Sequence, residues 1–155
     1  MKKMLFVLIS LSVFVACAAG TQIQTGPQGI RFETGKSRQA VMDVIIQVAT
    51  EDGYTIGPVN QSDGMITCEP RKMLDGVLSR KIEGGNWNMQ TKQSTLNHLI
   101  QFSAVVSRSG VVELKSLVMV SGVNGPVDRN KSEKLARYYE KEIMKILRTP
   151  RPKLL

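Results

Sequence analysis

The strongest constraint on the fold is a pair of alternating segments in the second half of the chain. Between His98 and Ser107, alternate residues are apolar and face one way: Ile100, Phe102, Ala104 and Val106. After the short turn Arg108-Ser-Gly110, the alternation resumes with Val112, Leu114, Val118 and Val120. A period of two is typical of strands that bury one face, and so short a turn joins antiparallel neighbours. The chain is therefore predicted to build an antiparallel sheet that is covered on one face.

Two amphipathic patterns predict the helices that cover this sheet. Between Ser37 and Gly53, four apolar residues follow the i, i+3, i+4, i+7 spacing of a helix face: Val41, Val44, Ile45 and Val48. Ser37 is the expected N-cap, and Gly53 is the expected stop because glycine accepts positive φ. The last helix is predicted to open at Asn130, with Glu133 at capping-box spacing, and to end by Thr149. Its apolar face holds Leu135, Tyr139, Ile143, Ile146 and Leu147.

The remaining segments complete the predicted order of elements. Residues 30–34 alternate as a short strand, and residues 54–69 read as a hairpin in which Pro58 confines its strand to an edge. Residues 71–95 are predicted to be a long loop with a possible short helix or strand near 73–82. The fold class that follows is α+β, an antiparallel sheet of about five strands with two helices packed on one face. It forms a single domain, residues 30–149, followed by a tail at 150–155.

The N-terminal residues have the composition of an export signal. Two lysines precede an apolar run from Leu5 to Ala16 that only two serines interrupt. The run is too short to cross a bilayer core, which needs about 20 apolar residues in a helix. Residues 1–16 are therefore predicted to be a signal peptide. Residues 17–29 are small and polar, with three glycines and one proline, and are predicted to be a tether.

The end of this run resembles the lipobox of bacterial lipoproteins. Its residues are Phe14-Val15-Ala16-Cys17, with Phe14 where leucine is commonest in the family. The resemblance implies cleavage before Cys17 and a diacylglycerol on its sulfur, usually joined by a third acyl chain, and several chains anchor stably. Ala18, in place of the aspartate that retains such proteins in the inner membrane, implies the periplasmic face of the outer membrane. Two alternatives stay open: ordinary signal-peptidase cleavage that leaves a soluble protein beginning at Ala19, and an uncleaved anchor.

Residues 39–69 carry a second resemblance. An amphipathic helix is followed by Gly53-Tyr54-Thr55-Ile56, the turn Asn60-Gln-Ser-Asp-Gly64 and a hydrophobic strand. This order resembles the helix-grip domains of the BamC lipoprotein family, which has two such domains where this chain has room for one. LptE-like lipoproteins have a similar plan of two helices on a sheet. Both resemblances imply a non-enzymatic component of the bacterial envelope that works through protein contacts.

The composition argues against several other functions. Lysine and arginine outnumber aspartate and glutamate by 21 to 13, and the excess falls from eight to six if the signal's two lysines are removed. Aromatic residues, at 5%, are too few for the stacking platforms of nucleic-acid binders, so no nucleic-acid partner is expected. The single histidine excludes a multi-histidine metal site, and the glycine pairs lack phosphate-loop spacing. Neither a metal nor a cofactor is expected.

Two residues of the chain are chemically suited to nucleophilic catalysis. Cys68 and His98 could form a thiol dyad. However, Cys68 lies within a strand pattern beside Ile66, whereas activated cysteines favour exposed, electropositive sites. We therefore expect Cys68 to be an inert buried thiol that shares one face with Ile66, and His98 to begin a strand near water. No enzymatic activity is predicted.

The predicted partner surface is the basic loop around Trp87. Trp and Arg dominate binding hot spots, and this loop also holds Arg71, Lys72, Arg80, Lys81 and Lys92. It would suit an acidic protein or anionic headgroups; the alternatives are a packing role for Trp87 and a merely solvated basic loop. The resulting hypothesis is a lipid-anchored envelope protein that acts as an accessory or scaffold for another envelope protein. The alternative function is a binding module for a lipid or other amphiphile, held between sheet and helices.

The anchor can be tested directly. Replacing the only acylatable sulfur at the signal end, Cys17→Ser, should abolish labelling by a fatty-acid probe and leave unprocessed precursor. Cys68→Ser is the matched control and should be labelled like the wild type. A labelled Cys17→Ser protein, or a native mature chain that begins at Ala19, would contradict the lipoprotein interpretation.

Overall fold

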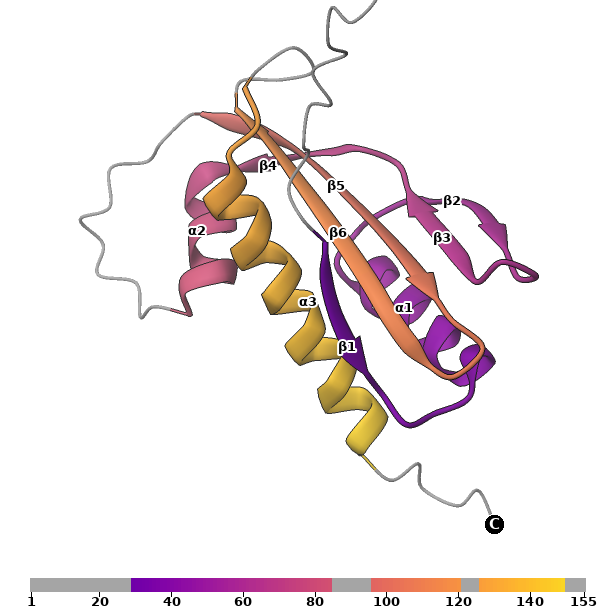
Figure 1. Ribbon diagram of the computed structural model, residues 1–155. Coiled ribbons are helices and arrows are strands. Elements are labelled where there is room, and N and C mark those ends of the chain that lie inside the picture. Colours follow the sequence, from indigo (N-terminus) through magenta and orange to yellow (C-terminus); the bar gives the residue numbers. More distant parts are fainter. Residues whose placement is uncertain (1–28, 85–95, 121–125, 150–155) are drawn as a thin grey trace, which may run out of the picture.

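The computed structural model describes residues 29–84, 96–120 and 126–149. These residues form an α+β domain in which a six-stranded antiparallel sheet is combined with three helices (Figure 1). The predicted fold class is confirmed. In chain order the elements are β1 (Ile30–Glu33), α1 (Arg38–Glu51), β2 (Ile56–Asn60), β3 (Met65–Cys68), β4 (Arg71–Leu74), α2 (Asp75–Glu83), β5 (Asn97–Val106), β6 (Val111–Val120) and α3 (Arg129–Arg148).

The sheet is organised around the long β5–β6 hairpin. The strand order is β1-β6-β5-β3-β2, and every pairing is antiparallel. Strands β3 and β4 share the same edge of β5: Thr67 pairs with Ser103, whereas Arg71 pairs with Ile100 further along. The sheet therefore has six strands rather than about five, because β4 continues the line of β3.

The predicted β2–β3 hairpin is confirmed, with Pro58 in the edge strand β2. Gly64 closes its turn with φ of 71°. The Val106 N–H donates to the Gly64 carbonyl over 2.8 Å, and a Cβ on Gly64 would lie only 2.0 Å from the Val106 carbonyl oxygen. Glycine is thus required both by the backbone conformation and by the close approach of β5.

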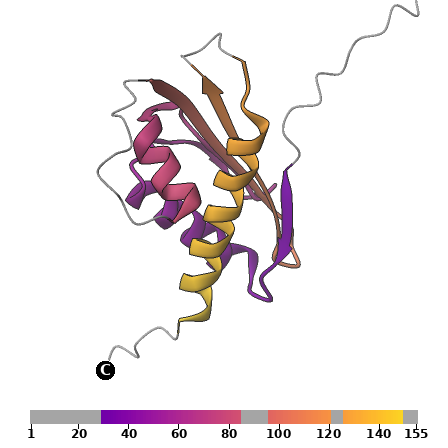
Figure 2. The same cartoon turned by 90° about the vertical axis from the view of Figure 1, so that its left-hand side faces the viewer.

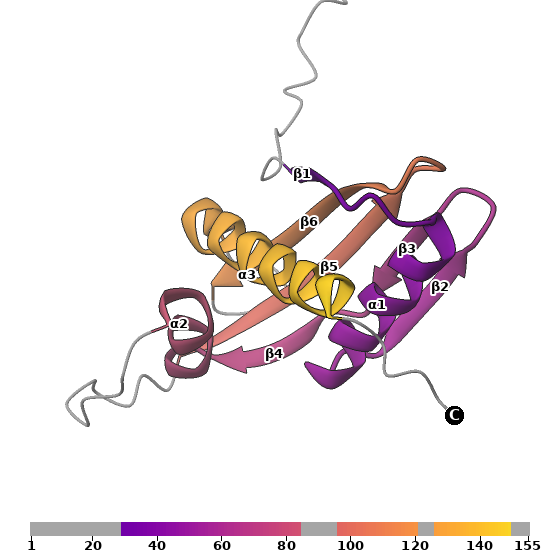
Figure 3. The ribbon, with the colours of Figure 1, turned by 90° about the horizontal axis from the view of Figure 1, so that it is seen from below.

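All three helices lie on one face of the sheet (Figure 2). Figure 3 shows α3 crossing the sheet between α1 and α2, and it contacts both of them. The core beneath α3 is aromatic: the rings of Phe102 and Tyr139 meet edge to face with centroids 4.8 Å apart, and Tyr54 packs beside both. Ile66 and Cys68 are both buried on this face, as their alternation predicts.

The segment 71–83 differs from the prediction of a long loop with a possible short helix or strand. It forms both, β4 and then α2 without a break. Met73 and Leu78 are its only buried residues, so each element is too short and too sparsely apolar to give a clear period. The rest of the predicted loop, residues 85–95, lies outside the described residues.

The ends of the helices are set partly by their own sequence and partly by the sheet. Ser37 caps α1 and Gly53 follows it with φ of 81°, as predicted. The start of α3 was predicted at Asn130, and this is wrong by two positions because Asp128 is the N-cap. The Asp128 carboxylate accepts a hydrogen bond from the Lys131 backbone N–H. The Asp128 backbone N–H donates to the Val118 carbonyl of β6 over 2.8 Å. Pairing with the sheet therefore fixes where α3 begins.

Burial gives a testable expectation for the thiol of Cys68. Desolvation raises its pKa to about 11, so little thiolate exists near neutral pH and the native thiol should alkylate slowly. In a Cys17→Ala background, where Cys68 is the only cysteine, labelling should accelerate sharply in guanidinium chloride. Cys68→Ala should fold with a stability loss of about 1 kcal/mol, the cost of one small buried group. Rapid labelling of the folded protein would instead support a reactive cysteine.

Candidate interaction site between helices α2 and α3

A hollow with clustered charge lies between α2 and residues 130–141 of α3. Its volume is about 600 Å³. It is lined by Lys81, Ile82, Glu83, Gly84, Asn130, Glu133, Lys134, Arg137, Tyr138 and Lys141. We call this the α2–α3 groove. Its chemistry is that of a binding surface, with ammonium and guanidinium groups beside one tyrosine ring.

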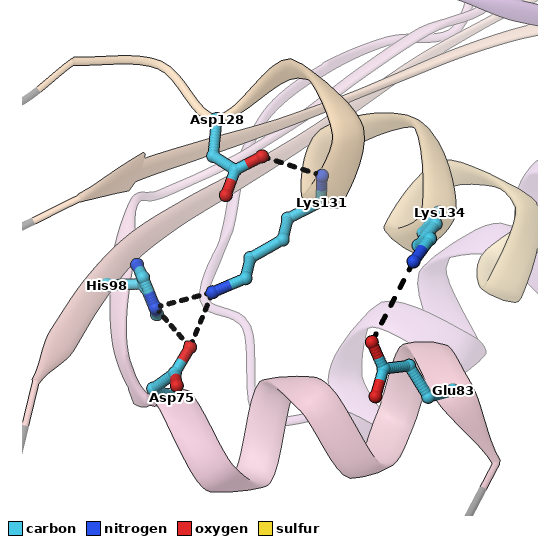
Figure 4. Close-up of polar contacts among 6 residues, drawn as sticks. All are labelled: Asp75, Glu83, His98, Asp128, Lys131 and Lys134. Atoms are coloured by element: carbon cyan, nitrogen blue, oxygen red, sulfur yellow. Dashed lines mark hydrogen bonds and ion pairs between the residues drawn. The ribbon is translucent and has the colours of Figure 1, made fainter. Parts of the chain in front are cut away.

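Asp75 fixes the α2 end of this arrangement. It is the first residue of α2, and its Oδ1 lies 2.7 Å from His98 Nε2 on β5 and 2.6 Å from Lys131 Nζ on α3 (Figure 4). The Asp75 backbone N–H also donates to the Leu96 carbonyl over 3.0 Å. One carboxylate therefore holds α2, β5 and α3 together. The hydrogen bond from Lys131 is the main reason that the pKa of Asp75 lies below its usual value.

His98 is not near water, contrary to the sequence-based expectation, although it does lie at the start of a strand. Its side chain is 1% exposed, and Nδ1 finds no hydrogen-bond partner among the described residues. The reason is that α2 and Lys131 cover the start of β5, an arrangement that the predicted loop did not include. Because a carboxylate only accepts hydrogen bonds, His98 Nε2 is placed to donate its hydrogen to Asp75 Oδ1.

A second carboxylate, Asp52, fixes the opposite side of α2. It follows α1 directly, is 13% exposed, and forms ion pairs with Arg71 on β4 and Lys81 on α2. The Tyr139 hydroxyl of α3 donates to the same carboxylate and lies 3.2 Å from the Tyr54 hydroxyl. Burial raises the pKa of both phenols, that of Tyr54 to about 12, so both remain protonated donors.

Aromatic rings complete the contacts of these two cations. The Arg71 guanidinium lies over the Tyr54 ring, 4.7 Å from its centroid, and Lys81 Nζ lies 4.7 Å from the centroid of Tyr138. Such cation–π contacts contribute roughly 0.5–2 kcal/mol each. Lys81 thus belongs both to the internal network at Asp52 and to the wall of the α2–α3 groove.

The other groove cations form only long ion pairs. Lys134 Nζ lies 3.7 Å from Glu83 across the groove, as Figure 4 shows, and Arg137 lies 3.5 Å from both Glu133 and Glu140 along α3. Lys141 forms no ion pair with another described residue. Exposed pairs at these distances contribute at most about 1 kcal/mol each. The groove therefore presents basic side chains whose ion pairs with neighbouring glutamates are weak.

The predicted partner-binding residues separate in space. Arg71 and Lys81 both reach Asp52 on the helix-covered side of the sheet. Lys72 pairs with Leu99 on the uncovered face and is exposed, and Arg80 is exposed on α2. Trp87 and Lys92, together with the lipidation residue Cys17, lie outside the described residues. Among the described members of the predicted set, only Lys81 lines the groove.

The proposed Cys68–His98 pair is not formed. Cys68 on β3 pairs with Ile56 of the edge strand β2, whereas His98 pairs with Met73 at the start of β5. His98 Nε2 lies within hydrogen-bonding distance of Asp75 Oδ1 and Lys131 Nζ, and so its partners are these two residues and not Cys68. Within the described residues, no three His, Cys, Asp or Glu side chains gather as a metal site.

Sequence reasoning missed the two carboxylates on which the site depends. The sequence analysis singles out neither Asp52, just before the predicted helix stop at Gly53, nor Asp75, within the predicted loop 71–95. Recognising α2 would have given one signal, because an acidic residue in the first turn suits a helix dipole. Their partners come from β4, β5 and α3, so the contacts themselves follow only from the fold.

Comparisons with known proteins leave the family open. No model of a known protein family matches the chain, and no match was found among curated proteins. None of the helices within residues 29–84, 96–120 and 126–149 is long and apolar enough to cross a bilayer.

The Asp75 junction predicts an acid-sensitive contribution to stability. Because the pKa of Asp75 is lowered in the fold, its stabilisation is present above about pH 4 and is lost as the pH falls through the lower folded value. Asp75→Asn should reduce the free energy of unfolding by about 1–3 kcal/mol at pH 7, since Lys131 and His98 lose a charged acceptor. Urea unfolding should show the gap between variant and wild type narrowing at pH 3.

The matched control is Asp43→Asn, on the exposed side of α1. It should change stability little at either pH. A gap for Asp75→Asn that is the same at pH 3 and pH 7 would show that the carboxylate charge is not what holds the junction.

Proposed function

We propose that this chain is a lipid-anchored protein of the bacterial envelope, carried on Cys17 at the periplasmic face of the outer membrane, that acts without catalysis as an accessory or scaffold for another envelope protein. The observation that supports a contact function is the α2–α3 groove, which gathers exposed cations and a tyrosine on one side of the domain. The signal peptide, the tether and the anchor are parts of this proposal that derive from the sequence.

Rigidity supports the groove as a contact surface. Its α2 wall is tied to the rest of the domain at both ends, by Asp75 to Lys131 and by Lys81 to Asp52. A wall held in this way loses little conformational freedom when a partner binds, and this lowers the cost of association. The groove is therefore preorganised, whereas a row of lysines on a loop would not be.

The sequence-based surface around Trp87 adjoins this groove along the chain. Gly84, the C-cap residue of α2 and part of the groove lining, precedes Trp87 by three positions. Trp87, Arg80 and Lys72 remain predicted contact residues, together with Lys81. Arg71 is half-buried against Asp52 and Tyr54, so we assign it mainly a structural role and not a contact role.

The alternative function, binding of a lipid or other amphiphile, would require an apolar hollow between the sheet and the helices. In the described part of the chain, large side chains with almost no exposure occupy this layer, among them Phe102, Tyr139 and Ile45. The α2–α3 groove lies outside that layer and is lined mainly by charged residues. Protein contact is therefore the better supported of the two.

Site-specific photo-crosslinking in intact cells tests this function. A photoreactive residue in place of Lys134, in the groove, should give one discrete adduct with an envelope protein. The same residue in place of Lys115, on the uncovered face of β6, is the matched control and should not. Adding Trp87→Ala to the Lys134 probe should lower the adduct yield, because truncating a hot-spot tryptophan costs about 2 kcal/mol or more. The thermal midpoint should stay nearly unchanged.

Two results would contradict the proposal. Adducts from Lys115 but not from Lys134 would place the interface on the open sheet face. A strong loss of stability in Trp87→Ala, with capture falling only in proportion, would make Trp87 a packing residue.

A further inference from the structure

We propose that the ligand of the α2–α3 groove is a linear acidic segment of a partner protein, which continues from the groove along α3. This inference rests on the proposed contact function and specifies its chemistry. The surface consists of the groove and of five basic residues, the cation row, which are Lys134, Arg137, Lys141, Lys145 and Arg148.

The spacing of the cation row places it on one side of α3. Its members are separated by three, four, four and three residues, so they follow one another along a helix face. That face points away from the buried residues Leu135, Tyr139 and Ile143. At a rise of 1.5 Å per residue, the row is about 21 Å long, which an extended peptide of about seven residues would cover.

The helix dipole explains only part of this row. Positive charge is favourable within the last turn of a helix, and this accounts for Lys145 and Arg148. Lys134 and Arg137 lie well before the last turn of α3, so the dipole does not account for them. Their position on the groove wall therefore calls for another interaction.

The row is accessible to carboxylates from outside. The side chains of Lys134, Arg137 and Lys145 are 49%, 58% and 74% exposed, and their ion pairs within the domain are 3.5–3.8 Å long. Because such pairs contribute little, an incoming carboxylate exchanges one weak contact for a closer one. The Tyr138 ring, which lies against Lys81 Nζ, adds an apolar surface near the N-terminal end of the cation row.

The distribution of charge favours a peptide over a membrane surface. Four glutamates flank the five cations: Glu83, Glu133, Glu140 and Glu142. A planar anionic bilayer interacts with the net charge of these nine residues, which is a single positive charge. At about 1 kcal/mol per unpaired basic residue, that attraction is weak. A flexible acidic chain can instead set its carboxylates on the cations and avoid the glutamates. The concave groove also fits a chain and not a plane.

Binding of a defined probe tests the inference. The full-length lipidated protein in detergent is titrated into a fluorescein-labelled peptide of alternating Glu and Ser, about eight residues long, with anisotropy as the readout. We expect saturable binding that weakens with added salt, because opposite charges are screened. Arg137→Glu and Lys141→Glu should each weaken binding about tenfold or more. Lys115→Glu, an equal charge change on the uncovered face, should leave it unchanged.

Folding and alternative ligands are controlled separately. Circular dichroism and urea unfolding verify each variant, and Lys141→Gln, which adds no new repulsion, should also weaken binding by several-fold. Equal losses in Lys115→Glu, or absence of saturable binding, would overturn the inference. Binding to phosphatidylglycerol vesicles that is lost in the same variants, without peptide binding, would assign the surface to a membrane and overturn it as well.

The outcomes separate this inference from the function on which it rests. A Lys134 crosslink to an envelope protein without binding of the acidic peptide would keep the contact function and reject an acidic ligand. Peptide binding without any crosslink in cells would keep the acid-binding groove and reject the proposed role.

Discussion

The pairing of β5 with β6 is the interaction on which the rest of the domain depends. β6 positions α3, because Val118 accepts the Asp128 N–H and donates its own N–H to the Ser132 hydroxyl at the first turn of the helix. β5 positions α2, because it pairs with β4 and provides His98 as the partner of Asp75. The two walls of the α2–α3 groove are thus attached to adjacent strands of one hairpin. The sheet therefore fixes the distance between the two walls and makes the groove rigid.

Two carboxylates convert this geometry into a fixed site. Asp52 and Asp75 each contact two basic side chains from different elements, so each basic side chain at these junctions has a carboxylate partner. Buried ion pairs add little net stability when compared with apolar packing, but losing one partner is costly because the other charge stays desolvated. Such junctions chiefly favour one position of α2 relative to the sheet and α3 over other positions. A rotated or shifted α2 would leave Lys81, His98 or Lys131 without an acceptor.

Much of the fold could be predicted from the sequence because its long elements have clear periods. The β5–β6 alternation, the apolar face of α1 and the Ser37 and Gly53 helix ends all reflect local chemistry, and each is confirmed. The failures concern residues whose role comes from distant partners. Asn130 resembles a cap in sequence, but the β6 backbone selects Asp128. The α2 segment has one fully buried residue, Leu78, so nothing local distinguishes it from a basic loop. Lys81 is the one described residue of the predicted contact set that lines the groove, and the sequence predicts α3 as a core helix.

Pro58 has a consequence for the behaviour of many copies together. Under the lipid anchoring proposed above, copies of the domain would diffuse in two dimensions, where their effective concentration is high and unpaired strand edges meet often. β2 is one such edge, yet Pro58 offers no N–H to an approaching strand, and at the opposite edge β1 is only four residues long. β4, which pairs only with β5 in the described sheet, is also only four residues long, so none of these edges is a good template for extension. The domain is thereby protected from edge-to-edge aggregation, and side-chain surfaces on its helices are left as the places where recognition can occur.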